Sequence, residues 1–133
     1  MPILNIQISA TPDRFPARAV NDILMRHTGE ILKKVAPLTA ISVTYTPREQ
    51  WFVGGKTLAE LGKSSFYLDI KVSDETNTAT EKAEYIRAVY ADMEKLLGDV
   101  HEVSYIHIDD ARPAAWGWGG LTQQFRAVKK MLM

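Results

Sequence analysis

The second residue, Pro2, is the strongest candidate for chemistry, because its nitrogen becomes a secondary amine if Met1 is removed. A small second residue such as proline normally permits that removal. An ordinary amine is protonated at neutral pH, but burial in an apolar pocket and a nearby cation both lower its pKa. The neutral amine can then take a proton from a carbon next to a ketone. Pro2 is therefore either a general base or only a residue that is tolerated after Met1. A retained Met1 would turn its nitrogen into an amide and remove the base.

Four further side chains are candidates for substrate contacts beside this base. Lys71 is able to hold a carboxylate or an enolate oxygen, or else to form a salt bridge with Asp69 or a neighbouring subunit. Tyr105 and His107 are each able to donate a hydrogen bond to a carbonyl oxygen. The alternative for Tyr105 is packing in an interface, and the alternative for His107 is a structural hydrogen bond. Trp51 lines a pocket wall or packs in the interior. The structural alternative stays open for each of the four.

Alternating apolar and polar residues predict four half-buried strands, and apolar residues at helical spacing predict two amphipathic helices. Pro2 has the same parity as the apolar face of the first strand. The second helix has a capping box at Thr78 and Glu81, and Gly98 is its expected stop. The expected strands cover 3–9, 40–46, 66–72 and 103–109, the helices about 15–35 and 78–97, and the turn-rich hairpins 47–57 and 116–120.

The chain matches itself at a shift of 64–65 residues. Residues 4–9 (LNIQIS) fall on 68–73 (LDIKVS), and residues 51–55 (WFVGG) fall on 116–120 (WGWGG). A repeat of this length indicates a duplicated supersecondary unit. Each unit joins two strands through a helix of about 20 residues, so each crossover should be parallel and right-handed.

These elements predict an α/β fold, in which two tandem β-α-β units form one four-stranded sheet with two helices on one face, plus short β-hairpins. We expect a single domain over 1–133, with pseudo-repeats at about 2–61 and 65–121 and a tail at 122–133 that either docks or frays. The other sheet face is either wet or turned toward other subunits. Its expected members are Asn5, Gln7, Ser42, Thr44, Asp69, Lys71, Tyr105 and His107.

The composition argues against several kinds of partner. Lys and Arg total 16, as do Asp and Glu, so net charge gives no argument for nucleic acid. The chain has no Cys, and His27 and His101 lack partners at ligand spacing, so we expect neither a metal nor a thiol site. No apolar run approaches the ~18 residues of a membrane span. We expect a cytoplasmic protein with no cofactor, no metal, no membrane partner and no nucleic-acid partner.

Together these residues resemble the tautomerase superfamily, of the 4-oxalocrotonate tautomerase and macrophage migration inhibitory factor type. The resemblance rests on the tandem repeat with Pro2 opening a β-α-β unit, APLT at 36–39, GG at 54–55, YIH at 105–107 and GW at 117–118. It extends over nearly the whole chain. It implies a homotrimer of duplicated units, with active sites between subunits around the amino-terminal proline.

The resemblance also implies roles for single residues. Pro2 matches the catalytic proline, while the substrate-binding positions would fall on Lys71, Tyr105, His107 and Trp51. The implied activity is a cofactor-independent keto–enol tautomerase, an isomerase acting on a small 2-oxo acid or an aromatic enol. The implied partners are that small-molecule substrate and other copies of the chain.

The chain departs from the specialised members at their charged positions. The arginines of 4-oxalocrotonate tautomerase fall on Pro12 and Ser42, and residues 73–78 (SDETNT) lack the arginines of the chloroacrylate dehalogenases and malonate semialdehyde decarboxylase. The dehalogenase acid falls at about Ala115. A hydratase-type dehalogenase or a decarboxylase on the same scaffold is one alternative, and the missing arginines and acid count against it. A non-catalytic trimeric binding protein is the other, if Met1 is retained.

Overall fold

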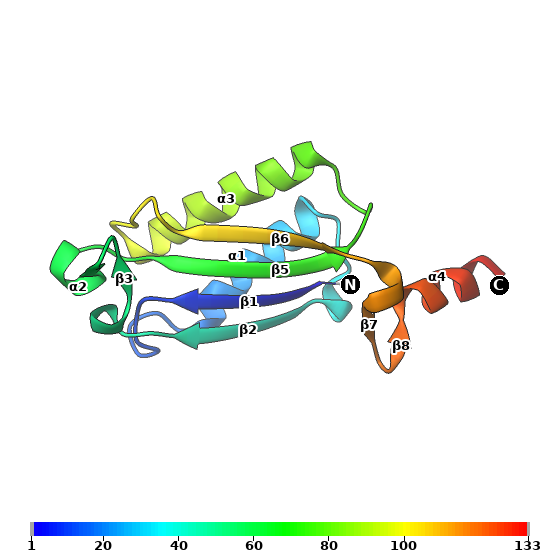
Figure 1. Cartoon of the computed structure of the whole chain (residues 1–133), viewed down its shortest axis with the longest axis horizontal. Helices are drawn as coiled ribbons and strands as arrows, with labels where there is room; N and C mark the ends of the chain where they lie inside the picture. Colours follow the sequence, from blue (N-terminus) through cyan, green and yellow to red (C-terminus); the bar gives the residue numbers. More distant parts are fainter. Residues whose placement is uncertain (1, 133) are drawn as a thin grey trace.

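The computed structural model describes residues 2–132, and its centre is a four-stranded mixed sheet in the order β2-β1-β5-β6 (Figure 1). Strand β1 (Ile3–Ile8) runs parallel to β2 (Ala40–Tyr45), and β5 (Phe66–Ser73) runs parallel to β6 (Tyr105–Ala111). The two pairs meet antiparallel at β1 and β5. The predicted α/β fold with tandem β-α-β units is confirmed, and the units lie in opposite directions across the sheet.

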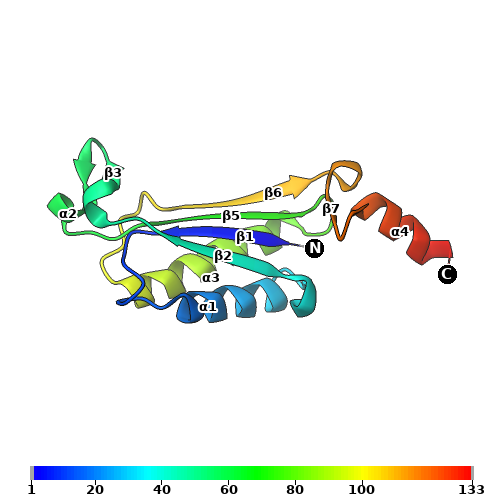
Figure 2. The ribbon, with the colours of Figure 1, turned by 90° about the horizontal axis from the view of Figure 1, so that it is seen from below.

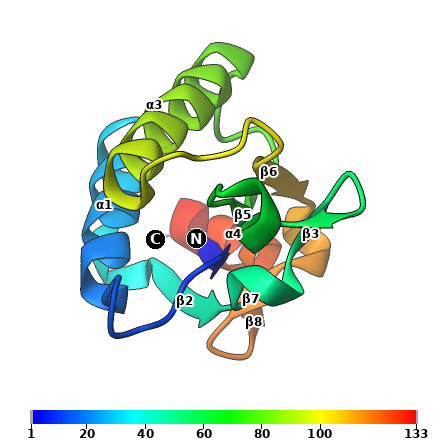
Figure 3. The ribbon, with the colours of Figure 1, turned by 90° about the vertical axis from the view of Figure 1, so that its left-hand side faces the viewer.

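Both long helices cover the same face of the sheet, as Figures 2 and 3 show. Helix α1 (Ala17–Glu30) follows β1, and helix α3 (Ala79–Leu97) follows β5. Alternate residues of the central strands point toward the helices, and each helix turns one apolar stripe toward the strands. The most deeply buried side chains of this core are Leu4, Ile6, Ile8, Val20, Leu24, Phe66, Leu68, Ile70, Tyr85, Val89 and Met93.

The ends of the two helices differ in how well the sequence predicts them. Helix α3 has the predicted capping box, in which the Glu81 N–H donates to Thr78 Oγ1 at 3.1 Å and the Thr78 N–H donates to the Glu81 carboxylate at 2.8 Å. Gly98 ends this helix with a φ of 70°. Helix α1 ends at Glu30, earlier than predicted, because Lys33 with a φ of 60° turns the chain toward β2.

A hairpin follows each parallel strand pair, and the two hairpins lie at opposite ends of the sheet (Figure 1). After β2 come the 3₁₀ turns and short elements η2 (Arg48–Gln50), β3 (Phe52–Val53), β4 (Lys56–Thr57) and α2 (Leu58–Leu61). After β6 come η3 (Pro113–Ala115), β7 (Gly117–Trp118), β8 (Leu121–Thr122) and α4 (Gln123–Leu132). The amino terminus lies at this second end, which we call the Pro2 end.

The short helices are the elements that the sequence analysis did not predict. Helix α2 closes the first hairpin, and α4 makes up most of the expected tail. Helix α4 extends beyond the sheet, and its main contacts are with η3 and β8 of its own hairpin (Figures 1 and 2). Within residues 2–132 no helix has the length and apolar character needed to cross a bilayer.

Candidate functional site

Pro2 is buried directly before β1. Its carbonyl oxygen accepts a hydrogen bond from the Ala40 N–H at 3.2 Å, which fixes the residue against the strand β2. A buried position lowers the pKa of an amine, because the protonated form loses its hydration. Met1 lies outside the described residues, so its removal, and with it the free amine of Pro2, stays a prediction.

Lys71 is the predicted site residue nearest to Pro2 in the strand register. It lies opposite Ile3, on the sheet face away from the helices. Its ammonium donates a hydrogen bond to the Asp69 carboxylate at 2.8 Å and lies 4.0 Å from the Asp109 carboxylate. The hydrogen bond to Asp69 raises the pKa of Lys71, so the side chain carries its positive charge throughout the neutral range. Within one chain, the salt bridge left open in the sequence analysis is therefore present.

His107 shares the Asp69 carboxylate with Lys71. The register places His107 opposite Asp69, and the His107 Nδ1 atom lies 3.5 Å from Asp69 Oδ1. Tyr105 is two residues away on the same strand and the same face, opposite Tyr67, and it is 65% exposed. The structure thus brings Lys71 and His107 together around one acid, while Tyr105 points outward with its ring free for a partner.

Two predicted site residues, Tyr105 and Trp51, are not brought to Pro2 within one chain. Tyr105 lies opposite Tyr67, which pairs with Gln7 near the end of β1 that is distant from Pro2. Trp51 lies at the base of the first hairpin, at that same end of the sheet. The residue is half-buried, and its carbonyl oxygen accepts the Leu58 N–H at 2.9 Å. Trp51 could therefore meet a Pro2 only from a neighbouring subunit.

Three residues that the sequence analysis did not select lie at the Pro2 end. Asp109 flanks Lys71, and it has the strand parity of Tyr105 and His107, which is the signal that could have identified it. In the second hairpin the Arg126 guanidinium stacks over the Trp118 ring at 3.6 Å from its centre. That contact requires helix α4, which was not predicted.

Buried polar atoms without a hydrogen-bond partner gather at the same end of the sheet. Strands β5 and β6 both run toward it, and α4 begins there. Within residues 2–132, these atoms are Ser73 Oγ, Asp110 Oδ1, Gln123 Oε1 and Arg126 Nε. An unpartnered buried polar atom costs about 1–3 kcal/mol, so such atoms call for an explanation. Water, a ligand or a second chain would satisfy these atoms.

A hollow of about 490 Å³ lies beside these atoms. The loop after β5, the turn η3 and the helix α4 form its walls, with Asp74, Glu75 and Arg112 as the charged residues. Pro2 does not line this hollow. Among residues 2–132, no group of three His, Asp or Glu side chains is arranged to hold a metal ion.

No family model matches the sequence, and the comparison with curated proteins found no match. Solved structures, in contrast, share the fold. The native fused 4-OT has 16% identity and a TM-score of 0.77, and the match covers 94% of this chain and 98% of that one. Pt0534 inactivated by 2-oxo-3-pentynoate has 9% identity and a TM-score of 0.77, with 93% and 98% covered.

A macrophage migration inhibitory factor homologue from Prochlorococcus marinus is also similar, with 24% identity and a TM-score of 0.71 over 90% of this chain and 97% of that one. Two further fused 4-OT structures, with 18% and 17% identity, are a symmetric and an asymmetric trimer. At these identities the similarity establishes the fold, and it extends over nearly the full length of both chains.

Proposed function

The chain has the fold of the tautomerase superfamily in its long, fused form, and on that premise we propose that it is a cofactor-independent keto–enol tautomerase. Its substrate is a small 2-oxo acid or an aromatic enol. Pro2 is the general base once Met1 has been removed. The working form is a homotrimer, in which neighbouring chains complete each site.

The proposed reaction moves one proton. The neutral Pro2 nitrogen takes a proton from the carbon next to the ketone, the C–H electron pair becomes a C=C bond, and the ketone oxygen becomes an enolate. The protonated Pro2 nitrogen then returns the same proton to this oxygen, and the reverse sequence converts an enol to its ketone. Lys71 holds the substrate carboxylate, and His107, or Tyr105 from a neighbouring chain, donates to the enolate oxygen, where a well-placed donor is typically worth about 3 kcal/mol.

The observation that carries the proposal is the buried position of Pro2 at the start of β1, one residue along from the position that Lys71 faces across the sheet. The buried amine position and the charged Lys71 at the same end favour a small acidic substrate there.

Exposed apolar side chains support the assembly. Helix α4 exposes Phe125 by 50%, Val128 by 51% and Met131 by 85%, while Tyr105 and Phe52 are 65% and 62% exposed. Apolar surface of this extent favours burial against another protein surface. Sedimentation should show a trimer, and a stable monomer at micromolar concentration would contradict the assembly.

The base is tested first with an electrophile. In 2-oxo-3-pentynoate the alkyne is conjugated to a ketone, so a neutral amine adds to it, and Pt0534 is inactivated by this compound. Intact mass first establishes that Met1 is absent. One equivalent of the reagent should then attach to the amino-terminal peptide of the mature protein. A variant with one extra residue ahead of Pro2 has an amide at that nitrogen and is the matched control.

The activity is tested with phenylpyruvate. The mature protein should ketonise its enol, and the variant extended ahead of Pro2 should not. Pro2→Ala keeps an amine but loses the rigid ring, so it should retain reduced activity. Unchanged ketonisation by the extended variant would exclude Pro2 as the base.

One observation favours a second candidate, a hydratase-type dehalogenase or decarboxylase. Two carboxylates, Asp69 and Asp109, lie within 4.0 Å of the single Lys71 ammonium. A net negative charge around the Pro2 amine would raise the pKa of that amine and keep it protonated, so that it would act as an acid rather than a base. Release of halide from a haloacrylate, or of carbon dioxide from a 3-oxo acid, would identify this chemistry.

A further inference from the structure

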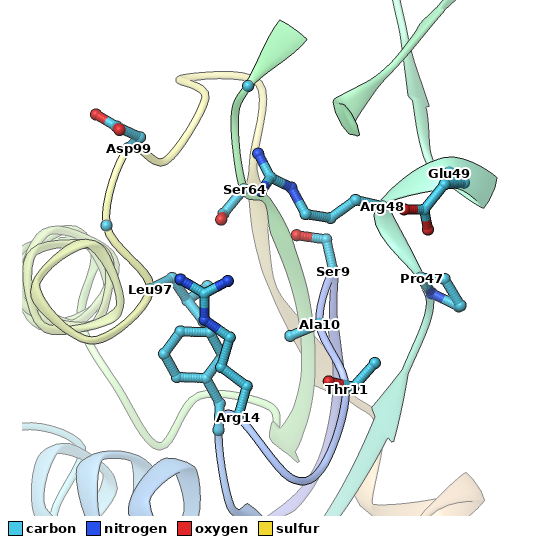
Figure 4. A pocket seen from close by; sticks show the side chains of 13 residues that line it. Ser9, Ala10, Thr11, Arg14, Pro47, Arg48, Glu49, Ser64, Leu97 and Asp99 are labelled. Atoms are coloured by element: carbon cyan, nitrogen blue, oxygen red, sulfur yellow. The ribbon is translucent and has the colours of Figure 1, made fainter. Parts of the chain in front are cut away.

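A second hollow lies at the end of the sheet opposite Pro2, and Figure 4 shows it from close by. Its volume is about 380 Å³. The loop after β1, the turn η2, the segment before β5 and the end of α3 form its walls. None of the site residues discussed above lines it. The proposed tautomerase site therefore gives no role to the residues that line this hollow.

Two guanidinium groups point into this hollow from separate elements. Arg14 reaches in from the loop after β1, and Arg48 reaches in from η2 (Figure 4). The Arg48 Nε–H donates to the Lys63 carbonyl oxygen at 2.8 Å, which fixes the side chain and leaves its terminal nitrogens for another acceptor. The Arg14 guanidinium lies 5.4 Å from the centre of the Phe15 ring. Within residues 2–132, no carboxylate forms an ion pair with either guanidinium.

Buried hydroxyl groups lie between the two arginines. Ser9 is 2% exposed and Ser64 is 8% exposed, and both line the hollow. Ser9 Oγ accepts the Ser65 N–H at 2.8 Å, so its own hydrogen remains to be donated. Polar groups of this kind, placed beside two cations, suit an oxyanion that accepts several hydrogen bonds.

The acidic and apolar residues of the wall define the ligand further. Glu49 and Asp99 lie at the rim, and in Figure 4 their carboxylates point away from the space between the arginines. Ala10, Pro47 and Leu97 supply apolar surface next to the cations. A bare inorganic anion would leave this apolar surface unfilled, whereas an organic acid covers both kinds of surface.

The internal repeat explains why such a hollow exists at this end. At a shift of 64 residues Pro2 falls on Phe66, so the hollow is the counterpart, in the second unit, of the Pro2 end. A phenylalanine within the chain offers no amine, so the hollow holds no proline base. Binding without turnover is what the remaining groups support.

We propose that this hollow binds a small organic acid through its carboxylate, held by Arg14 and Arg48, without converting it. The site is independent of the amine at Pro2 and needs no second chain for its cations. It makes the two ends of the sheet different in role, one reactive and one that only binds.

The probe for the experiment is phenylacetate, which carries a carboxylate and an apolar ring but no ketone. Titration of ¹⁵N-labelled protein should move the amide signals of Ser9, Ser64 and Asp99. Arg14→Gln and Arg48→Gln should each weaken this binding by about tenfold or more, because each removes a charge-assisted hydrogen bond. Arg87→Gln, an exposed arginine on α3, is the matched control and should bind as the wild type does.

Two comparisons make the outcome decisive. Arg48→Lys keeps the charge but not the planar fork, so it should bind between wild type and Arg48→Gln, which separates a ligand contact from a folding defect. Inorganic phosphate should move the same signals more weakly than phenylacetate. Unchanged affinity in both Gln variants, equal weakening in Arg87→Gln, or tighter binding of phosphate would each overturn the proposal.

Discussion

Replacing Lys71 with Gln is expected to raise the pKa of the Pro2 amine in the mature protein. Lys71 lies opposite Ile3, one residue along from Pro2. Strands lie about 4.8 Å apart and rise about 3.3 Å per residue, so the two positions are roughly 6 Å apart. A cation at that distance disfavours protonation of the amine, and its removal makes protonation easier.

The register sets an upper limit on this effect, because the roughly 6 Å joins two backbone positions and the Lys71 ammonium extends on the sheet face away from the helices. Two unit charges about 6 Å apart repel by about 0.7 kcal/mol at a dielectric constant of about 80, and by about 1.4 kcal/mol at about 40. The Lys71 side chain is 37% exposed, so water screens it and the lower value is the better guide. The acid dissociation constant of the Pro2 amine should therefore fall by about threefold at most in Lys71→Gln.

Asp69→Asn should act in the opposite direction, because it removes an anion. The effect should be smaller, since Asp69 lies opposite Asn5, three residues from Pro2. A ¹⁵N NMR titration of the amino-terminal proline measures both shifts, and the pH profile of kcat/KM should follow them. Lys56→Gln, in the hairpin at the other end, is the control. A lowered pKa in Lys71→Gln, or the same direction in both variants, would refute the electrostatic reasoning.

Three further substitutions test the packing behind the site. Tyr85→Phe should lower the free energy of unfolding by about 1–3 kcal/mol in urea, because the buried Thr28 hydroxyl loses its partner at 2.9 Å; adding Thr28→Val should cost less than the two single changes summed. The hydrogen bond from His27 lowers the pKa of Asp92 below its usual 3.8, so its contribution is present above that pH and lost as the pH falls through the folded value. Asp92→Asn should therefore destabilise the protein at neutral pH, and acid melts should show the difference from wild type disappearing. Gly117→Ala should lower the melting temperature, because a Cβ there collides with backbone of β8.

Features encoded by neighbours along the chain were predictable from the sequence. The strand faces follow from alternation with a period of two, and Pro2 is buried, as expected from its parity with that apolar face. The capping box of α3 is equally local, since Thr78 and Glu81 are three residues apart. Helix α4 had a comparable signal that went unused, namely Thr122, whose hydroxyl accepts the Phe125 N–H at 3.0 Å.

Features that depend on distant segments were not predictable. Whether Lys71 pairs with Asp69 depends on the rotamers that the sheet leaves open, and its approach to Asp109 depends on the register between β5 and β6. The hollow with two arginines requires the loop after β1 and the turn η2 to lie side by side. Hydrophobic periodicity predicts helices and strands, but it does not predict which loops contact each other. Arg14 and Arg48 are 34 positions apart in the sequence, which is why neither stood out.

In the proposed mechanism, the antiparallel arrangement of β1 and β5 means that the position of the chain start decides which end of the sheet can react. A polypeptide has a single α-amine, so of two ends built alike only the one holding the chain start can offer it. A circular permutation makes this concrete, since both termini lie at the Pro2 end (Figure 1). Joining them and opening the chain ahead of Phe66 would transfer the amine to the end lined by Arg14 and Arg48. The location of reactivity in this fold is thus a property of where the polymer is cut, and protein engineering can move it without redesigning the core.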